Sequence, residues 1–202
     1  MTPALATLEG RHAVVTGGGR GIGAAVARAL AERGARITLV GRTRATLDEE
    51  AGRLRALTEV HCETADVADA ESVTAAFTGA AAALGPVGIL VNNAGQAASA
   101  PFSRTDLALW QKMLDVNLTG TYLGIRAVLP GMLDLGWGRI VNVASTASLK
   151  GYAYISAYCA AKHAVLGLTR ALAQELARKP VTVNAVCPGY TDTDLLRESV
   201  AN

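Results

Sequence analysis

HAVVTGGGRGIGAAVARALAERG, residues 12–34, decides the fold of this chain. It begins as a short apolar run (12–16), passes through a glycine-rich turn (16–23) and continues as an alanine-rich helical stretch. Glycines let the backbone turn sharply, and the helix that follows offers free N–H groups and the positive end of its dipole. A strand, a glycine turn and a helix in this order predict a site for nucleotide phosphates rather than a plain loop.

The rest of the chain repeats this alternation of apolar runs and helical stretches. Candidate strands lie at 12–16, 36–40, 59–62, 87–91, 138–144 and 181–186. Candidate helices lie near 21–33, 43–57, 69–84, 105–132 and 156–178. Several strands are apolar almost throughout, as in a parallel sheet that is buried on both faces. We therefore predict an α/β fold, a Rossmann-type doubly wound parallel β-sheet flanked by helices on both faces, in a single domain of residues 1–202.

Composition limits the class of protein. The 202 residues are 50% hydrophobic and 18% charged with a net charge of +2, which is typical of a soluble globular chain. The small basic excess argues against nucleic acid, and the uncharged, mostly apolar run 75–91 is shorter than the ~20 apolar residues of a membrane-spanning helix. No signal sequence is visible, and Cys62, Cys159 and Cys187 lack metal-ligand spacing. We expect a cytoplasmic protein with reduced cysteines, no metal, and no nucleic-acid or membrane partner.

The end of the second candidate strand bears on the identity of the nucleotide. NAD sites usually carry an acidic residue there for the ribose 2′-hydroxyl, whereas NADP sites carry an arginine. Here Gly41 is followed by Arg42 and Arg44, and no carboxylate lies between residues 36 and 47. Guanidinium groups suit a 2′-phosphate, and Arg20 in the glycine turn is a third cation. We predict NADP, with NAD as the possible alternative; Arg42 and Arg44 could also simply begin a solvated helix.

The stretch YCAAK, residues 158–162, places a tyrosine and a lysine four residues apart. On a helix this spacing puts both side chains on one face. A nearby ammonium favours the phenolate and lowers the tyrosine pKa, which gives a proton donor and acceptor that works nearer neutral pH. The alternative is that Tyr158 is a packing residue and Lys162 a solvated surface charge.

Short motifs in a fitting order resemble those of the short-chain dehydrogenase/reductase family. TGGGRGIG resembles its cofactor turn, Asp66-Val67 its adenine contact, and NNAG (92–95) its central-sheet motif. PG (188–189) with the threonines that follow resembles its nicotinamide-side loop. The candidate cofactor-binding residues are Gly17, Arg20, Gly21, Ile22, Gly23, Gly41, Arg42, Asp66, Val67, Asn93, Ala94, Gly95, Tyr158, Lys162, Pro188, Gly189, Thr191 and Thr193.

The chain also has a set of four residues that resembles the catalytic tetrad of that family: Asn117, Ser145, Tyr158 and Lys162. The resemblance implies that Tyr158 is the general acid–base and that Lys162 lowers its pKa and holds the nicotinamide ribose. Ser145 would hydrogen-bond the substrate oxygen and stabilise developing charge. Asn117 would bind a water that links Lys162 to solvent. The simpler alternatives are that Ser145 caps a local turn and that Asn117 satisfies buried backbone.

The segment from GRIVNVAST to NAVCPG is similar to β-ketoacyl reductases and to ketoreductases of aromatic polyketide synthesis. The polyketide enzymes carry a Pro-Gly-Gly motif after NNAG, where this chain reads QAAS. We predict an NADP-linked oxidoreductase that interconverts a ketone and a secondary alcohol, with a 3-oxoacyl-type substrate. An NAD-dependent hydroxyacyl or secondary-alcohol dehydrogenase is one alternative. A non-catalytic nucleotide-binding redox sensor is another.

Assembly and the end of the chain are further expectations from the resemblance. Members of the family usually continue through a substrate-covering helical segment, another helix and a last parallel strand. The chain ends at Asn202, so we expect the fold without that last strand and lid. Helices corresponding to 105–132 and 156–178 pair across a two-fold axis in the family. The resemblance therefore implies a homodimer or homotetramer.

Overall fold

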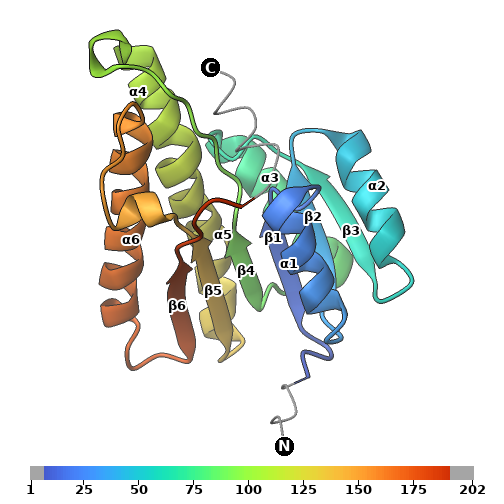
Figure 1. The fold of residues 1–202 in the computed structure, drawn as a ribbon. Helices are drawn as coiled ribbons and strands as arrows, with labels where there is room; N and C mark the ends of the chain where they lie inside the picture. Colours follow the sequence, from blue (N-terminus) through green and yellow to red (C-terminus); the bar gives the residue numbers. More distant parts are fainter. Residues whose placement is uncertain (1–6, 192–202) are drawn as a thin grey trace, which may run out of the picture.

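The computed structural model describes residues 7–191 and builds them around one parallel β-sheet (Figure 1). The strands are β1 (His12–Thr16), β2 (Arg36–Gly41), β3 (Val60–Thr64), β4 (Ile89–Asn92), β5 (Gly138–Val143) and β6 (Val181–Val186). The helices are α1 (Gly21–Ala31), α2 (Arg44–Leu54), α3 (Ala70–Leu84), α4 (Leu107–Leu114), α5 (Gly120–Asp134) and α6 (Ser156–Glu175). These elements confirm the predicted α/β class.

The strand order of the sheet fixes where a ligand can bind. The six strands lie in the order β3-β2-β1-β4-β5-β6, and every neighbouring pair is parallel. The chain therefore reverses its direction of winding between β1 and β4. In doubly wound sheets the ligand crevice lies at this reversal, beyond the carboxyl ends of the strands.

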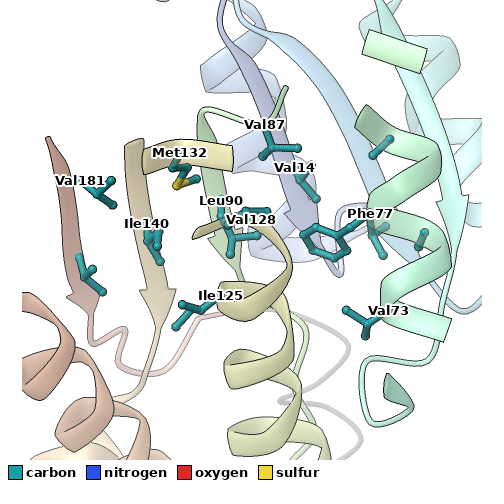
Figure 2. Packing of buried hydrophobic residues seen from close by; sticks show 14 of the residues in the cluster. Val14, Val73, Phe77, Val87, Leu90, Ile125, Val128, Met132, Ile140 and Val181 are labelled. Carbon is teal, nitrogen blue, oxygen red and sulfur yellow. The ribbon is translucent and has the colours of Figure 1, made fainter. Parts of the chain in front are cut away.

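Helices cover both faces of the sheet and bury two apolar clusters. On one face, α3 and α5 bring Phe77, Val128 and Met132 against Val14, Leu90 and Ile140 of the strands (Figure 2). On the other face, α1 and α2 pack on a second cluster. Its members include Ala27, Leu47, Leu54, Val15, Ile37 and Leu39. No helix within residues 7–191 is long and apolar enough to cross a bilayer.

Strands β5 and β6 differ from the expectation of burial on both faces. Every residue of β1 is buried, whereas burial alternates along β5 and along the first part of β6. The reason is that α5 and α6 pack on one face of these two strands, as Figure 1 shows. Side chains of the opposite face, such as Thr182 and Val186, are exposed.

The predicted helix at 105–132 is interrupted by one wider turn. α4 ends at Leu114, a π-helical turn spans Asp115–Thr119, and α5 continues from Gly120. Such turns disrupt the regular i→i−4 hydrogen-bond ladder and occur often at functional sites. The turn contains Asn117, which is fully buried. The apolar spacing of the sequence does not reveal this insertion.

Candidate active site

The glycine turn between β1 and α1 leaves backbone amides available to a ligand. Gly17 and Gly21 have φ values of +63° and +56°, in the left-handed region that favours glycine. Arg20 precedes the first helical residue with an extended backbone, and no side chain caps the helix there. No acidic residue occupies the first turn of α1. The amides and dipole of this helix terminus are therefore oriented to receive an anion.

Asn93 ties this turn to the neighbouring strand. Its side-chain amide donates to the carbonyls of Thr16 and Gly17, at 2.9 and 3.2 Å. The backbone N–H groups of Asn93 and Ala94 both donate to Thr16 Oγ1 at 3.0 Å. Thr16 is not among the predicted site residues, although its position directly before the glycines indicates a place in the turn. Together these bonds hold the carboxyl ends of β1 and β4 side by side.

Gly23 is placed differently from its prediction as a cofactor-binding residue. A Cβ atom at this position would lie 2.1 Å from the Gly17 carbonyl oxygen and 2.5 Å from Asn93 Nδ2. Gly23 is buried and, among the described residues, is not part of the lining of either cavity. Its lack of a side chain lets α1 pack against the back of the turn, so its contribution to ligand binding is indirect.

Replacing Gly23 by alanine should therefore displace the turn. We expect Gly23→Ala to lower the free energy of unfolding by about 1–3 kcal/mol, the usual range for overpacking, and to weaken dinucleotide binding. Urea unfolding and cofactor titration measure the two effects. Gly52→Ala in α2 is the matched control, because nothing lies within 4 Å of the added Cβ atom. Removing a helical glycine there should be neutral or stabilising. Equal behaviour of the two variants would contradict this prediction.

A cleft of about 300 Å³ opens beside the glycine turn, at the sheet edge where the winding reverses. It brings together most of the predicted cofactor residues. They are Gly17, Arg20, Gly21, Ile22, Gly41, Arg42, Asp66, Val67, Asn93, Ala94 and Gly95. Thr43, Thr46, Gln96 and Val116 also line it and were not predicted. Arg44 is not among the residues that line the cleft, since its Nε donates to Asp48 at 2.9 Å on the surface of α2.

A second cavity of about 330 Å³ adjoins the first and shares Ile22, Asn93 and Gly95 with it. It contains the four predicted tetrad residues and the start of the loop after β6. The predicted residues that line it are Asn117, Ser145, Tyr158, Lys162, Pro188, Gly189 and Thr191. Thr193 lies outside the described residues. Tyr152 and Tyr190, which were not among the predicted site residues, also line this cavity. Their rings meet edge to face at 6.4 Å.

Ser145 caps a local turn and also belongs to the candidate active site. Its Oγ accepts from the backbone N–H of Ala147 at 3.1 Å and caps a short 3₁₀ turn, Thr146–Ser148, so the capping alternative is correct. The same residue lines the second cavity beside Tyr158, and its hydroxyl acts to lower the pKa of the Tyr158 phenol. The cap fixes the position of the Ser145 hydroxyl, which lies within reach of the tyrosine hydroxyl.

The pKa of Tyr158 does not follow the expectation that Lys162 lowers it. Burial raises the pKa of the phenol above its usual value, and the hydrogen bond from Ser145 only partly opposes this shift. Lys162 lies on the same helix face, as the spacing predicts, but its Nζ is 5.8 Å from the centroid of the tyrosine ring. It donates instead to the carbonyl of Val143 at 2.8 Å. The protonated tyrosine is therefore the stable form at neutral pH.

Lys162 is a buried cation rather than a solvated surface charge. The side chain is 5% exposed, and its ammonium reaches the backbone at the end of β5. Burial lowers its pKa to about 8, because a charged ammonium loses hydration inside the protein. The alternative of a solvated lysine is wrong.

Asn117 uses its side chain on the backbone. Its Nδ2 donates to the carbonyls of Gln96 and Met113 at 2.9 and 3.0 Å, and its Oδ1 accepts from the Gln96 N–H at 3.3 Å. The side chain of Asn117 therefore satisfies buried backbone groups, as the simpler alternative proposed. Its water-binding role stays a prediction. A Cβ atom on Gly95 would lie 2.8 Å from Asn117 Oδ1 and 3.5 Å from Lys162 Nζ. Gly95 thus leaves room between these two side chains.

Comparison with known proteins agrees with this geometry. The sequence profile of the family described as short chain dehydrogenase matches residues 11–202. Acetoacetyl-CoA reductase of Paracoccus denitrificans is 42% identical over 185 residues, which cover 92% of this chain and 75% of that protein. D-beta-hydroxybutyrate dehydrogenase of Rhizobium meliloti is 39% identical over 195 residues, with 94% and 75% covered. A solved variant of actinorhodin polyketide ketoreductase with NADPH has a TM-score of 0.91 at 38% identity, with 96% and 76% covered.

The fold and the site define a nicotinamide-dependent oxidoreductase of the doubly wound type. The chain belongs to the short-chain dehydrogenase/reductase family and acts, as an NAD(P)-dependent enzyme, on CH–OH groups and the corresponding carbonyls. It spans about three quarters of the length of these relatives.

Proposed function

We propose that this chain is an NADP-linked ketoreductase that reduces a 3-oxoacyl-type ketone to a secondary alcohol. The observation that carries the proposal is the placement of Ser145 and Tyr158 in one cavity, which shares lining residues with the glycine-turn cleft. The raised pKa of Tyr158 keeps the phenol protonated at neutral pH, as a proton donor to a ketone oxygen must be. The similarity to an acetoacetyl-CoA reductase supports the substrate class.

A dinucleotide would extend across the two cavities, which share lining residues. The amides of the glycine turn would hold the pyrophosphate, Asp66 and Val67 would contact the adenine, and Pro188, Gly189 and Thr191 would contact the nicotinamide side. The bound cofactor supplies the hydride, and the protein supplies orientation and electrostatics.

Side chains of the second cavity would stabilise charge, transfer the proton and hold the nicotinamide ribose. The Ser145 hydroxyl would donate to the substrate carbonyl oxygen and stabilise the negative charge that develops there. Tyr158 would give its proton to the same oxygen. Lys162 would hold the nicotinamide ribose hydroxyls, and its positive charge would stabilise the phenolate that Tyr158 becomes. Asn117 would bind a water that returns a proton through Lys162.

Arg42 should confer the preference for NADP. Arg42 lines the first cleft, and no hydrogen bond or ion pair engages its guanidinium within residues 7–191. We expect Arg42→Ala to weaken NADPH binding about tenfold or more, the value of a lost charge-assisted contact, with a much smaller effect on NADH. Fluorescence titration of both cofactors measures this. Arg44→Ala is the matched control, because that guanidinium is paired with Asp48. Tighter binding of NADH than NADPH by the unmodified protein would contradict the cofactor proposal.

The substrate class and the enzyme class can be tested together. The panel consists of 3-oxoacyl thioesters, cyclic ketones and small secondary alcohols, each followed by nicotinamide absorbance. We expect the largest kcat/KM for a 3-oxoacyl thioester with NADPH. Faster oxidation of a hydroxyacyl substrate with NAD would favour the dehydrogenase alternative. Tight cofactor binding without turnover of any substrate would favour the redox sensor.

We also propose that the chain forms at least a homodimer through the layer of α4, α5 and α6. This layer carries large exposed apolar side chains, among them Leu107, Tyr122 and Leu133. Exposed apolar surface of this kind is typical of a self-complementary interface. Light scattering should give at least twice the chain mass at tens of micromolar, and Tyr122→Asp should shift the population towards monomer. A monomer before substitution would contradict the proposal.

A further inference from the structure

A chain of buried polar side chains crosses the core beside the proposed active site. Asn92, the last residue of β4, is paired with Asn142 of β5 in the strand register. The side-chain N–H of Asn92 donates to Asn142 Oδ1 at 2.9 Å. The side-chain N–H of Asn142 donates in turn to Thr169 Oγ1 of α6, also at 2.9 Å. All three residues are at most 4% exposed. Asparagine is disfavoured inside strands, so its presence in β5 calls for a reason beyond local propensity.

These hydrogen bonds run in one direction. The Thr169 hydroxyl donates to the Val165 carbonyl at 2.8 Å, so its oxygen is left to accept from Asn142. Asn142 Oδ1 is then left to accept from Asn92, whose amide also donates to the carbonyl of Thr121 at 3.3 Å. Each side chain fixes the orientation of the next. Removing the hydroxyl of Thr169 would leave a buried N–H of Asn142 without a partner.

Three links connect α6 to β5 and to the turn that follows this strand. The Asn142–Thr169 pair is one of them. The other two belong to the proposed active site: Ser145 lies beside Tyr158 in the second cavity, and Lys162 donates to the backbone of β5. Along β5 and the turn after it the linked residues come in the order 142, 143 and 145, and their partners on α6 come in the order 169, 162 and 158. The three links therefore follow one another along the interface. Thr169 stands seven residues after Lys162, which places both on the same buried face of the helix.

The main neighbours of α6 are α4, β6 and the 3₁₀ turn Thr146–Ser148 that follows β5. Much of the buried face of this helix is formed by small side chains, such as Ala157, Ala161 and Val165. Small side chains form shallow ridges, which resist sliding along the helix axis less than large interlocking ones. A directional hydrogen bond between buried groups does resist sliding, because a shift would leave both groups unpaired.

We propose that Asn142 and Thr169 are positioning residues, which fix the register of α6 along β5 and thereby hold Tyr158 and Lys162 opposite Ser145. This inference rests on the proposed function, since the register matters for the rate only if those three side chains carry out the reaction. Among the described residues, neither Asn142 nor Thr169 lines either of the two cavities of the site. Their effect would be indirect, and a misplacement of about 1 Å can lower a rate by about 100-fold.

The test compares two buried threonines whose hydroxyl groups each hydrogen-bond a polar side chain. Thr169→Val removes the hydroxyl and keeps the volume, and Thr169→Ser restores the hydroxyl. Thr38→Val is the matched control, because Thr38 is fully buried and its hydroxyl lies 2.8 Å from His12 Nε2, on strands away from the tetrad. For each variant the melting temperature, the affinity for NADPH, and the pH profiles of kcat and kcat/KM are measured with the best ketone of the substrate panel.

We expect both valine variants to melt at lower temperature, but only Thr169→Val to lose about tenfold or more in kcat and to shift the pH profile. Thr169→Ser should recover most of the wild-type rate and profile. The proposal is overturned if Thr169→Val melts lower, as Thr38→Val does, yet keeps the wild-type kcat and pH profile. If Thr169→Val does not fold, Thr169→Ala is judged by the same criteria.

A double variant separates failure of this inference from failure of the proposed function. If Thr169 acts by positioning Tyr158, Thr169→Val should have little further effect on kcat in a Tyr158→Phe background. Fully additive losses would overturn the positioning role. Wild-type turnover in Tyr158→Phe alone would instead overturn the assignment of Tyr158, and with it the proposed mechanism.

Discussion

Tyr158→Phe should lower kcat by about 100-fold or more, the usual contribution of a general acid, while NADPH still binds. The substitution keeps the ring and removes only the hydroxyl of a residue that lines the second cavity together with Ser145. The protonated phenol is the stable form of this group, so the wild-type enzyme holds the proton ready for the ketone oxygen. The loss should therefore fall on the chemical step and leave cofactor affinity nearly unchanged.

Single-turnover reduction with saturating NADPH measures that step directly. Tyr152→Phe is the matched control: its hydroxyl lies in the same cavity but donates to Thr146 Oγ1 at 3.0 Å. We expect its kcat to fall far less than that of Tyr158→Phe. Near-normal turnover in Tyr158→Phe with cofactor bound would show that the proton comes from another group.

The fold could be predicted because its signals are local. Each strand and helix leaves a periodic pattern, and the glycine turn marks the point where a nucleotide must approach the backbone. The predicted first strand, 12–16, coincides with β1. Parallel pairing and the right-handed connection rule then leave few topologies for this order of elements.

The parts that could not be predicted depend on contacts between distant segments. The sequence does not distinguish a glycine that admits a ligand from one that admits a neighbouring backbone, and Gly23 is of the second kind. The spacing of Tyr158 and Lys162 gives a shared helix face but not the direction of the ammonium, which is set by the Val143 carbonyl. The shift of the Tyr158 pKa depends on burial in the assembled cavity, for which five residues of sequence carry no signal.

Lys162→Met should remove most of the turnover and also change how stability depends on pH. Burial lowers the Lys162 pKa from its ordinary 10.5 to about 8 in the folded protein. Between these two values the unfolded chain binds more protons than the folded one, so the free energy of unfolding rises with pH in this window. The contribution is on the order of 3 kcal/mol across the window, at 1.36 kcal/mol for each pKa unit. Below pH 8 both states are protonated at Lys162, and this slope disappears.

The difference in unfolding free energy between the wild type and Lys162→Met isolates this effect. The unpaired Val143 carbonyl left by the substitution adds an offset that does not change with pH, because a carbonyl does not titrate. Urea unfolding at several pH values from 7 to 10.5 should therefore show the difference rising in favour of the wild type. Lys150→Met, at an exposed lysine, controls for the loss of one positive charge. A difference that stays constant across this range would mean that Lys162 is not buried as a cation. The ammonium would then be hydrated, and its proposed support of the Tyr158 phenolate would lose its electrostatic basis.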